Sequence, residues 1–170
     1  MSRLRDRRGW LLALSALIIA LDRSTKHLVS SHIEIGNDIV VIPHVFAISH
    51  VLNPGAAFSI FSNSPDPERT RWILTGFSII AAIVVFLILL RIGRRATLAA
   101  IALALVLGGA IGNAWDRIAY GTVIDFLEVH IVHYHWPDFN VADSAIVIGG
   151  ILLLIDSLRP RKEPAPAPKP

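Results

Sequence analysis

The sequence predicts an all-α membrane protein, a bundle of four transmembrane helices that carries a small extracytoplasmic β-rich cradle. Hydrophobic residues make up 54% of the 170-residue chain and charged residues only 17%, and the mean hydropathy is +0.59. This apolar share is well above that of soluble proteins. The apolar residues gather in four segments, each near the roughly 20 residues needed to cross a bilayer core.

The predicted spans are, in order, about residues 10–29, 72–90, 97–115 and 142–158. The second contains no charged residue and is the clearest. For the first, the alternative is a secretory signal peptide, because arginines precede a short apolar core. That core continues directly into LDRSTK without a small-x-small cleavage site, which favours a retained span.

Basic residues predict the orientation of the bundle. Eleven of the 16 Lys and Arg residues flank the spans on one side: Arg3, Arg5, Arg7, Arg8, Arg91, Arg94, Arg95, Arg159, Arg161, Lys162 and Lys169. We expect this side to be the cytoplasm, so residues 1–158 form a single integral membrane domain with outward segments 30–70 and 116–141. Residues 159–170 are then a disordered cytoplasmic tail, rich in Pro and Ala. The net charge of +3 is a topology signal, and no nucleic-acid partner is needed to explain it.

The outward segment 30–70 is rich in Ile, Val and Phe. Turn signals occur at Gly36-Asn37 and at Asn53-Pro54-Gly55, so we expect a small set of strands here. DPER at 66–69 places an N-cap Asp before a first-turn Pro, which predicts the start of the second helix.

Two glycine motifs predict close approaches of the backbone. Gly108 and Gly112 are four residues apart in the third span, a spacing typical of helix–helix contact. NPGAAF at 53–58 is a turn followed by small residues, and residues 55–57 leave room for a ligand to approach the backbone.

Polar residues border the spans mainly on the outer side. They are Asp22, Lys26, Asn113, Asp116, Arg117, Asp125, Asn140 and Asp143. Asp22 and Lys26 are four residues apart and can pair on one helix face. Ionisable residues at such positions are rare in membrane proteins and usually face the bundle interior or a watery cavity. These side chains therefore define a candidate site near the outer membrane surface, whereas Asp156, at the inner end, is interpreted as interfacial.

Asp125 and Asp143 lie in contrasting settings. With Asn140 as N-cap, Asp143 takes the third helical position, where free backbone N–H groups and the helix dipole favour a carboxylate. Taken alone, Asp143 could be no more than a helix-start residue. Asp125 lies in the apolar stretch VIDFL, where burial would raise its pKa. Two carboxyl groups in such different surroundings are suited to act as an acid and a base.

Other chemistries have weaker support. The chain has no cysteine, which excludes thiolate nucleophiles and cysteine metal sites. His130, His133 and His135 in HIVHYH fit no common zinc spacing, and we expect no metal there. A nucleophile elbow and an HExxH motif are both absent.

Five motifs occur in the order of a known family: LDRSTK (21–26), NPGAAF (53–58), GGAIGNAWDR (108–117), VIDF (123–126) and FNVADSA (139–145). Together they resemble the bacterial lipoprotein signal peptidases, the type II signal peptidases, over about residues 10–158. Each motif is weak alone, but five in order on a four-span profile are specific. The resemblance implies four membrane helices with both ends cytoplasmic, an outward β-rich cradle and an amphipathic arm.

The resemblance implies that Asp125 and Asp143 form an aspartyl catalytic pair. It implies substrate-binding or supporting roles for Asp22, Lys26, Asn53, Gly55, Asn113, Arg117 and Asn140. The implied reaction removes the signal peptide from a prolipoprotein, at the outer face of the bacterial cytoplasmic membrane, by cleavage just before a diacylglyceryl-modified cysteine. The implied partners are such prolipoproteins, membrane lipids and the cyclic peptide inhibitor globomycin, and no metal or organic cofactor is implied.

Departures from the family pattern are slight. Arg23 replaces a commonly uncharged residue, Pro54 occupies a position that varies, and the histidine-rich stretch 130–135 lies in a variable region. The main alternative is a small transporter or proton relay built on Asp22, Asp125 and Asp143. However, the acids gather at one face and leave the second span without a polar path. A non-catalytic scaffold would leave the paired acids unexplained, and the GxGD motif of another intramembrane aspartyl protease class is absent.

Overall fold

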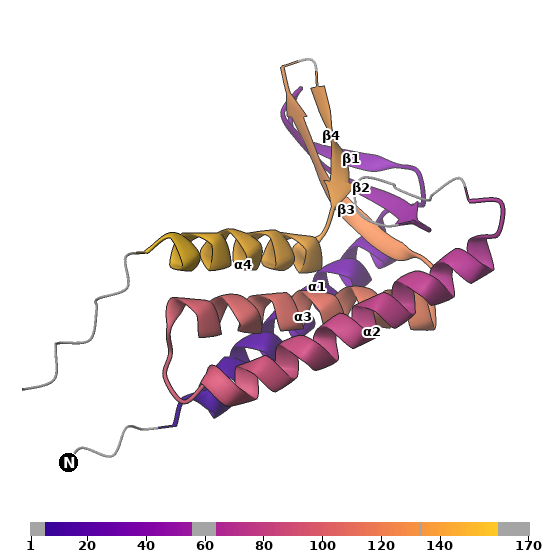
Figure 1. Ribbon diagram of the computed structural model, residues 1–170. Helices are drawn as coiled ribbons and strands as arrows, with labels where there is room; N and C mark the ends of the chain where they lie inside the picture. Colours follow the sequence, from indigo (N-terminus) through magenta and orange to yellow (C-terminus); the bar gives the residue numbers. More distant parts are fainter. Residues whose placement is uncertain (1–5, 56–63, 133, 160–170) are drawn as a thin grey trace, which may run out of the picture.

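The computed structural model describes residues 6–55, 64–132 and 134–159. These residues form helices and strands in the order α1, β1, β2, α2, α3, β3, β4, α4. The strands make a sheet that stands at one end of the helices, and α1 begins and α4 ends at the opposite end (Figure 1). The predicted fold class is therefore confirmed in its coarser form, a helical majority with a small antiparallel sheet.

Among the described residues, three helices are long and apolar enough to cross a membrane: α2 (Pro67–Ile92), α3 (Leu98–Ala119) and α4 (Val141–Leu158). The most apolar is α2, with a hydropathy of 3.0 over its best window. Many of its large side chains are exposed, and Phe77 is 73% exposed. Apolar surface of this extent requires apolar surroundings. These helices match the predicted spans 72–90, 97–115 and 142–158.

The predicted first span, 10–29, is also a helix, α1 (Arg8–His32). It differs in composition, because Asp22, Arg23 and Lys26 lie in its C-terminal half. Asp22 and Lys26 are 0% and 1% exposed, so these charges face the bundle interior. Burying them there requires partners within the protein.

Local sequence signals fix two of the helix starts. The Asp66 side chain accepts a hydrogen bond from the Arg69 backbone N–H at 3.0 Å, with Pro67 in the first turn, as DPER predicts. Thr97 caps α3 in the same way. The end of α3 is later than expected, because the helix continues beyond residue 115 to Ala119. Asp116 and Arg117 are therefore held on a helix and not on the outward segment.

Glycines bring α3 into close contact with two neighbouring helices. A Cβ atom on Gly108 would lie 2.8 Å from the Ile18 Cβ atom of α1, which confirms the predicted helix–helix contact. A Cβ atom on Gly109 would lie 2.3 Å from the backbone oxygen of Ala142 on α4. The start of α4 can therefore approach α3 this closely only because residue 109 has no side chain.

We expect Gly109→Ala to lower the thermal stability of the detergent-purified protein by about 1–3 kcal/mol, because α4 must move away from α3 to admit the methyl group. Gly150→Ala is the matched control, since nothing lies within 4 Å of its Cβ position. In an exposed helical position alanine is favoured over glycine. A Gly109→Ala variant as stable as Gly150→Ala would contradict the contact.

The sheet has the strand order β1-β2-β3-β4, and all neighbours are antiparallel. Strands β1 (Asp38–Ile42) and β2 (Phe46–Asn53) come from the segment predicted to form strands. Strands β3 (Val123–Ile131) and β4 (Tyr134–Phe139) come from segment 116–141, for which no strand was predicted. The first residues of β3 are buried without alternation, so the period-2 signal is missing there.

A small apolar cluster joins the sheet to the bundle. Val29 and Ile33 at the end of α1 pack with Phe126 of β3. This contact places the start of β3 beside the C-terminal ends of α1 and α3. The residue before Phe126 is Asp125, so the same packing positions the first candidate acid.

Candidate active site

Asp143 is held at the start of α4 by a reciprocal pair of hydrogen bonds. The Asn140 Oδ1 atom accepts from the Asp143 backbone N–H at 2.9 Å, and Asp143 Oδ2 accepts from the Asn140 backbone N–H at 3.2 Å. This capping box confirms the predicted helix start. It fixes one oxygen of Asp143 in place.

Asp125 lies near the start of β3 and is 3% exposed. Asn53 Nδ2 donates to its Oδ2 atom at 2.9 Å, and Asn140 Nδ2 donates to its Oδ1 atom at 2.7 Å. Burial, followed by the nearby negative charge of Asp143, raises the pKa of Asp125 to about 7. The apolar setting therefore raises the pKa of Asp125 as predicted, and the charges of the two acids interact directly.

Two asparagines connect the acids. Asn140 contacts both, because its amide nitrogen binds Asp125 while its amide oxygen caps Asp143. Asn113 Nδ2 donates to the second oxygen of Asp143 at 2.7 Å. Asn113 Oδ1 in turn accepts from Asn140 Nδ2 at 3.3 Å and from Lys26 Nζ at 3.1 Å. Amide donors thus orient both carboxyl groups from fixed positions on α3 and α4.

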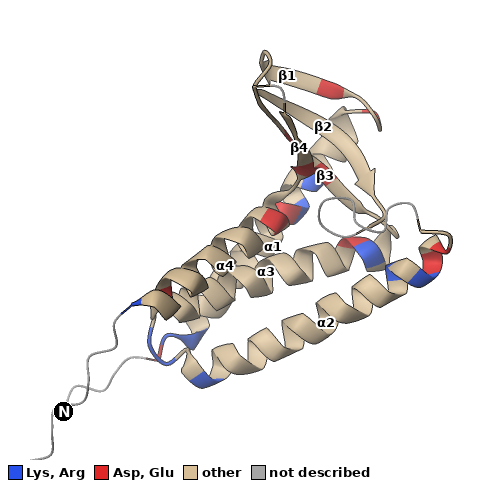
Figure 2. Cartoon of the chain, turned by 45° about the horizontal axis from the view of Figure 1, so that its top comes forward, with Lys and Arg blue, Asp and Glu red and all other residues tan. Residues whose placement is uncertain are grey.

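A buried ion cluster is formed by Asp22, Arg23, Lys26 and Asp116. It contacts Asn113 through Lys26. Lys26 Nζ is 3.0 Å from Asp22 Oδ2 and 2.7 Å from Asp116 Oδ2, which confirms the predicted Asp22–Lys26 pair. Arg23 pairs with Asp116 as well. Figure 2 shows these charged segments of α1 and α3 on the side of the helices nearer the sheet.

The buried ion cluster also holds the start of α4. Asp22 Oδ1 accepts a hydrogen bond from the Ala142 backbone N–H at 3.1 Å. The sequence placed Asp116 among the polar residues of the candidate site but gave it no role, and it did not place Arg23 in the site, although Lys26 needs more than one acceptor when it is fully buried. That requirement, together with an acid at the end of α3, is the signal that could have identified Asp116.

Arg117 positions the turn that follows β2. Its Nη2 atom donates to the Gly55 backbone oxygen at 2.9 Å, and Gly55 N–H donates to Asn53 Oδ1 at 2.9 Å. Since Asn53 binds Asp125, this turn lies beside the acid pair. Ala56, Ala57 and Phe58 of the NPGAAF motif lie outside the described residues.

The structure thus links all nine predicted site residues in one network. They are Asp22, Lys26, Asn53, Gly55, Asn113, Arg117, Asp125, Asn140 and Asp143. His130 and His135 of HIVHYH do not take part in this network, because they lie farther along the hairpin; His133 lies outside the described residues. One carboxyl group with a raised pKa beside a second carboxyl group can supply both a proton donor and a proton acceptor.

Comparison with known proteins gives consistent matches. The family described as signal peptidase (SPase) II matches residues 14–159. The chain is similar to a lipoprotein signal peptidase of Pseudomonas fluorescens (strain Pf0-1), with 43% identity over 92% of this chain and 91% of that protein. It is similar to one of Solibacter usitatus (strain Ellin6076), with 44% identity over 94% of this chain and 97% of that protein.

A solved structure is also similar, a bacterial membrane enzyme determined by the in meso method at 2.3 Å resolution. The TM-score is 0.80, with 28% sequence identity over 95% of this chain and 97% of that chain. A second membrane enzyme structure, determined at 1.9 Å by the same method, gives a TM-score of 0.75 with 30% identity, over 92% of this chain and 97% of that chain.

Proposed function

Because the chain belongs to the signal peptidase II family, whose members are proteases that process lipoproteins, we propose that it is an aspartyl endopeptidase that cuts prolipoproteins just before a diacylglyceryl-modified cysteine. The observation that carries the aspartyl mechanism is the position of Asn140. Its amide group binds Asp125 and Asp143 at once, so the two acids are oriented as a unit.

In the proposed mechanism Asp125 and Asp143 share one proton, because two neighbouring carboxylates do not both ionise easily. The ionised acid, which we assign to Asp143, takes a proton from water as the water attacks the scissile carbonyl carbon. The protonated acid, Asp125, donates to the carbonyl oxygen. Asp143 then delivers the proton it took from water to the leaving nitrogen, and Asp125 takes back the proton from one hydroxyl of the tetrahedral intermediate. The C–N bond breaks, and the new carboxyl end stays on the signal peptide. Acid–base help of this kind contributes roughly 100- to 10,000-fold.

The surrounding residues have supporting roles in this proposal. Asn113 and Asn140 hold the carboxyl groups in place, and Arg117 with Gly55 presents the turn after β2 to the substrate backbone. The buried ion cluster keeps α1, α3 and α4 in register. Globomycin, membrane lipids and prolipoproteins remain the expected partners by family resemblance, with no metal or organic cofactor in the reaction.

We place the site at the outer face of the bacterial cytoplasmic membrane, with α1 as a fourth span and both termini cytoplasmic. The distribution of basic residues supports this orientation. Arg8 begins α1, Arg91 lies in the last turn of α2, and Arg94 and Arg95 lie in the loop between α2 and α3. Figure 2 shows basic segments at the end of the helices remote from the sheet, and basic residues favour the cytoplasmic side. A site at the outer edge leaves the lipid chains of the substrate in hydrocarbon while the peptide bond meets water.

The test is cleavage of a diacylglyceryl-modified prolipoprotein by the purified protein, followed by gel shift. The matched substrate is the same precursor with serine in place of the lipidated cysteine. We expect cleavage of the first and none of the second. Equal cleavage of both would refute the proposed substrate, and no cleavage of either would refute the function.

The same assay should show a pH dependence set by Asp125. Its pKa is raised to about 7, so the group is protonated below that pH and loses its proton above it. We therefore expect kcat/KM to be retained just below pH 7 and to fall as the pH rises through about 7. The decline should be absent from a variant with an amide at position 125, whose residual rate should not change over this range. A wild-type rate that is flat between pH 6 and 8 would contradict the role of Asp125 as the acid.

A further inference from the structure

A second group of titratable side chains lies on the β3–β4 hairpin, away from the acid pair. Glu128 and His130 are two residues apart on β3, so they project from the same face of the strand. His135 on β4 is the cross-strand partner of His130. One ligand atom from each of the three lies within 4.8 Å of the others.

The three side chains converge on a single point. His130 Nε2 is 2.7 Å from Glu128 Oε1, and His135 Nε2 is 3.6 Å from the same oxygen. The two imidazole rings are stacked, with centroids 4.9 Å apart. Ligand atoms around a tetrahedral zinc ion lie roughly 3.3 Å from one another, since each is about 2 Å from the metal. The observed arrangement therefore needs only small side-chain rotations to bind an ion.

Charge at this point favours a cation. Asp138 Oδ1 is 3.2 Å from His135 Nε2, so two carboxyl groups lie beside the histidines. In the part of the chain that the structure describes, the ion pairs of Glu128 and Asp138 go to these histidines alone. No Lys or Arg in that part neutralises them.

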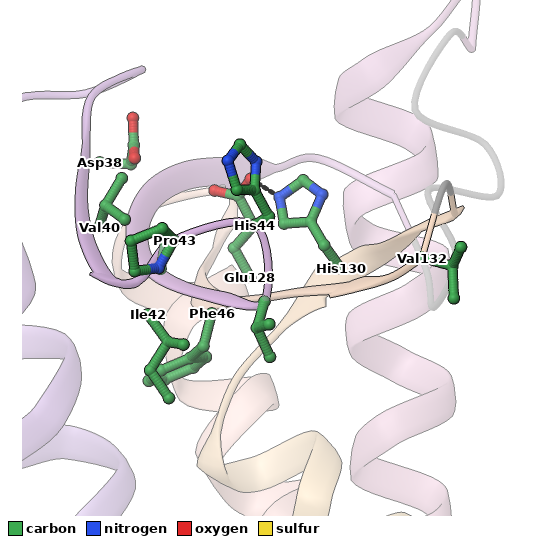
Figure 3. Close-up of a pocket in the computed structure, with 11 residues that line it drawn as sticks. Asp38, Val40, Ile42, Pro43, His44, Phe46, Glu128, His130 and Val132 are labelled. Carbon is green, nitrogen blue, oxygen red and sulfur yellow. Dashed lines mark hydrogen bonds and ion pairs between the residues drawn. The ribbon is translucent and has the colours of Figure 1, made fainter.

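The group also has access from outside. Glu128 and His130 line a cavity of about 430 Å³, with His44 from the turn between β1 and β2 on its wall. Figure 3 shows the Glu128–His130 contact beside His44. A three-ligand site on this wall leaves room for a water molecule or a fourth side chain, as tetrahedral zinc requires.

We propose that Glu128, His130 and His135 bind one zinc ion, which ties β3 to β4 outside the catalytic site. Two imidazoles and a carboxylate suit zinc, and no thiolate is needed. Spacing along the chain did not indicate this site, because strand pairing brings the ligands together and one of them, Glu128, lies outside the histidine-rich stretch 130–135. Since β4 leads directly into Asn140, the ion would stabilise the hairpin that enters α4.

The experiment is a zinc titration of detergent-purified full-length protein that lacks a polyhistidine tag and has been stripped with EDTA. Competition with a chromophoric chelator gives stoichiometry and affinity. We expect one zinc ion per chain and a rise in the melting temperature of about 5 °C at saturation. His130→Gln and His135→Gln should each weaken binding by at least roughly 10- to 100-fold.

Two further variants keep the result interpretable. His27→Gln removes an exposed histidine of α1 and should bind zinc as the wild type does. Glu128→Gln keeps the shape of the side chain and should weaken binding even if a histidine variant fails to fold. The proposal is overturned if the wild type shows no saturable site, or if His130→Gln, His135→Gln and Glu128→Gln bind as tightly as His27→Gln.

Discussion

The Asp125→Asn variant is expected to cleave the lipid-modified precursor about 100 to 10,000 times more slowly than the wild type. The amide cannot donate a carboxyl proton to the scissile carbonyl oxygen, so the loss should appear in kcat more than in KM. Single-turnover cleavage followed by gel shift measures it directly.

The folded state should tolerate this change. A carboxyl group whose pKa is raised in the folded protein opposes folding at neutral pH, and the asparagine removes that cost. Against this, an amide has one oxygen where the carboxylate has two, so either Asn53 or Asn140 loses its acceptor. These effects have opposite signs, and we expect the melting temperature at pH 7.5 to stay within a few degrees of the wild type. A variant that melts far earlier would assign Asp125 a structural role instead.

Lys26→Met is expected to destabilise the protein by about 3–5 kcal/mol, the typical cost of removing one partner from a buried ion pair. The substitution leaves Asp22 and Asp116 without their shared ammonium group, although both are 0% exposed. Thermal unfolding in detergent should show the loss. Activity should fall too, because Lys26 also donates to Asn113, which holds Asp143.

Two further variants distinguish the loss of the buried ion pairs of Lys26 from a general effect of removing a positive charge. Arg69→Met removes an exposed cation of α2 and should leave the melting temperature nearly unchanged. Adding Asp116→Asn to Lys26→Met removes one acid along with the base, so part of the lost stability should return. If Lys26→Met melts like Arg69→Met, the buried ion cluster is not what holds α1 to α3.

The helices and their starts could be predicted from sequence because their signals are local. Asp66 before Pro67, and Asn140 three residues before Asp143, define helix starts within single turns. Gly108 likewise marks a close contact by its own lack of a side chain. The proposal that Asp125 and Asp143 form a catalytic pair came from family resemblance, while the difference between their surroundings was predicted from VIDFL and from the helix start.

What could not be predicted depends on pairing between distant segments. Strand β3 pairs with β2 about 70 residues earlier, and its buried start, VIDF, lacks alternation. Asp116 joins the ion cluster only because α3 continues past its expected end and lies against α1. His130 and His135 meet Glu128 through cross-strand register, which residue spacing along the chain does not reveal.

The most direct measurement of the central claim is cleavage and melting temperature in parallel for Asp143→Asn. The asparagine side-chain oxygen can still accept from the Asn140 backbone N–H, so the helix start and the fold should survive. We predict a normal melting temperature with cleavage reduced by at least about 100-fold. Cleavage at the wild-type rate by this variant would mean that Asp143 only starts α4, and would contradict catalysis by the aspartate pair.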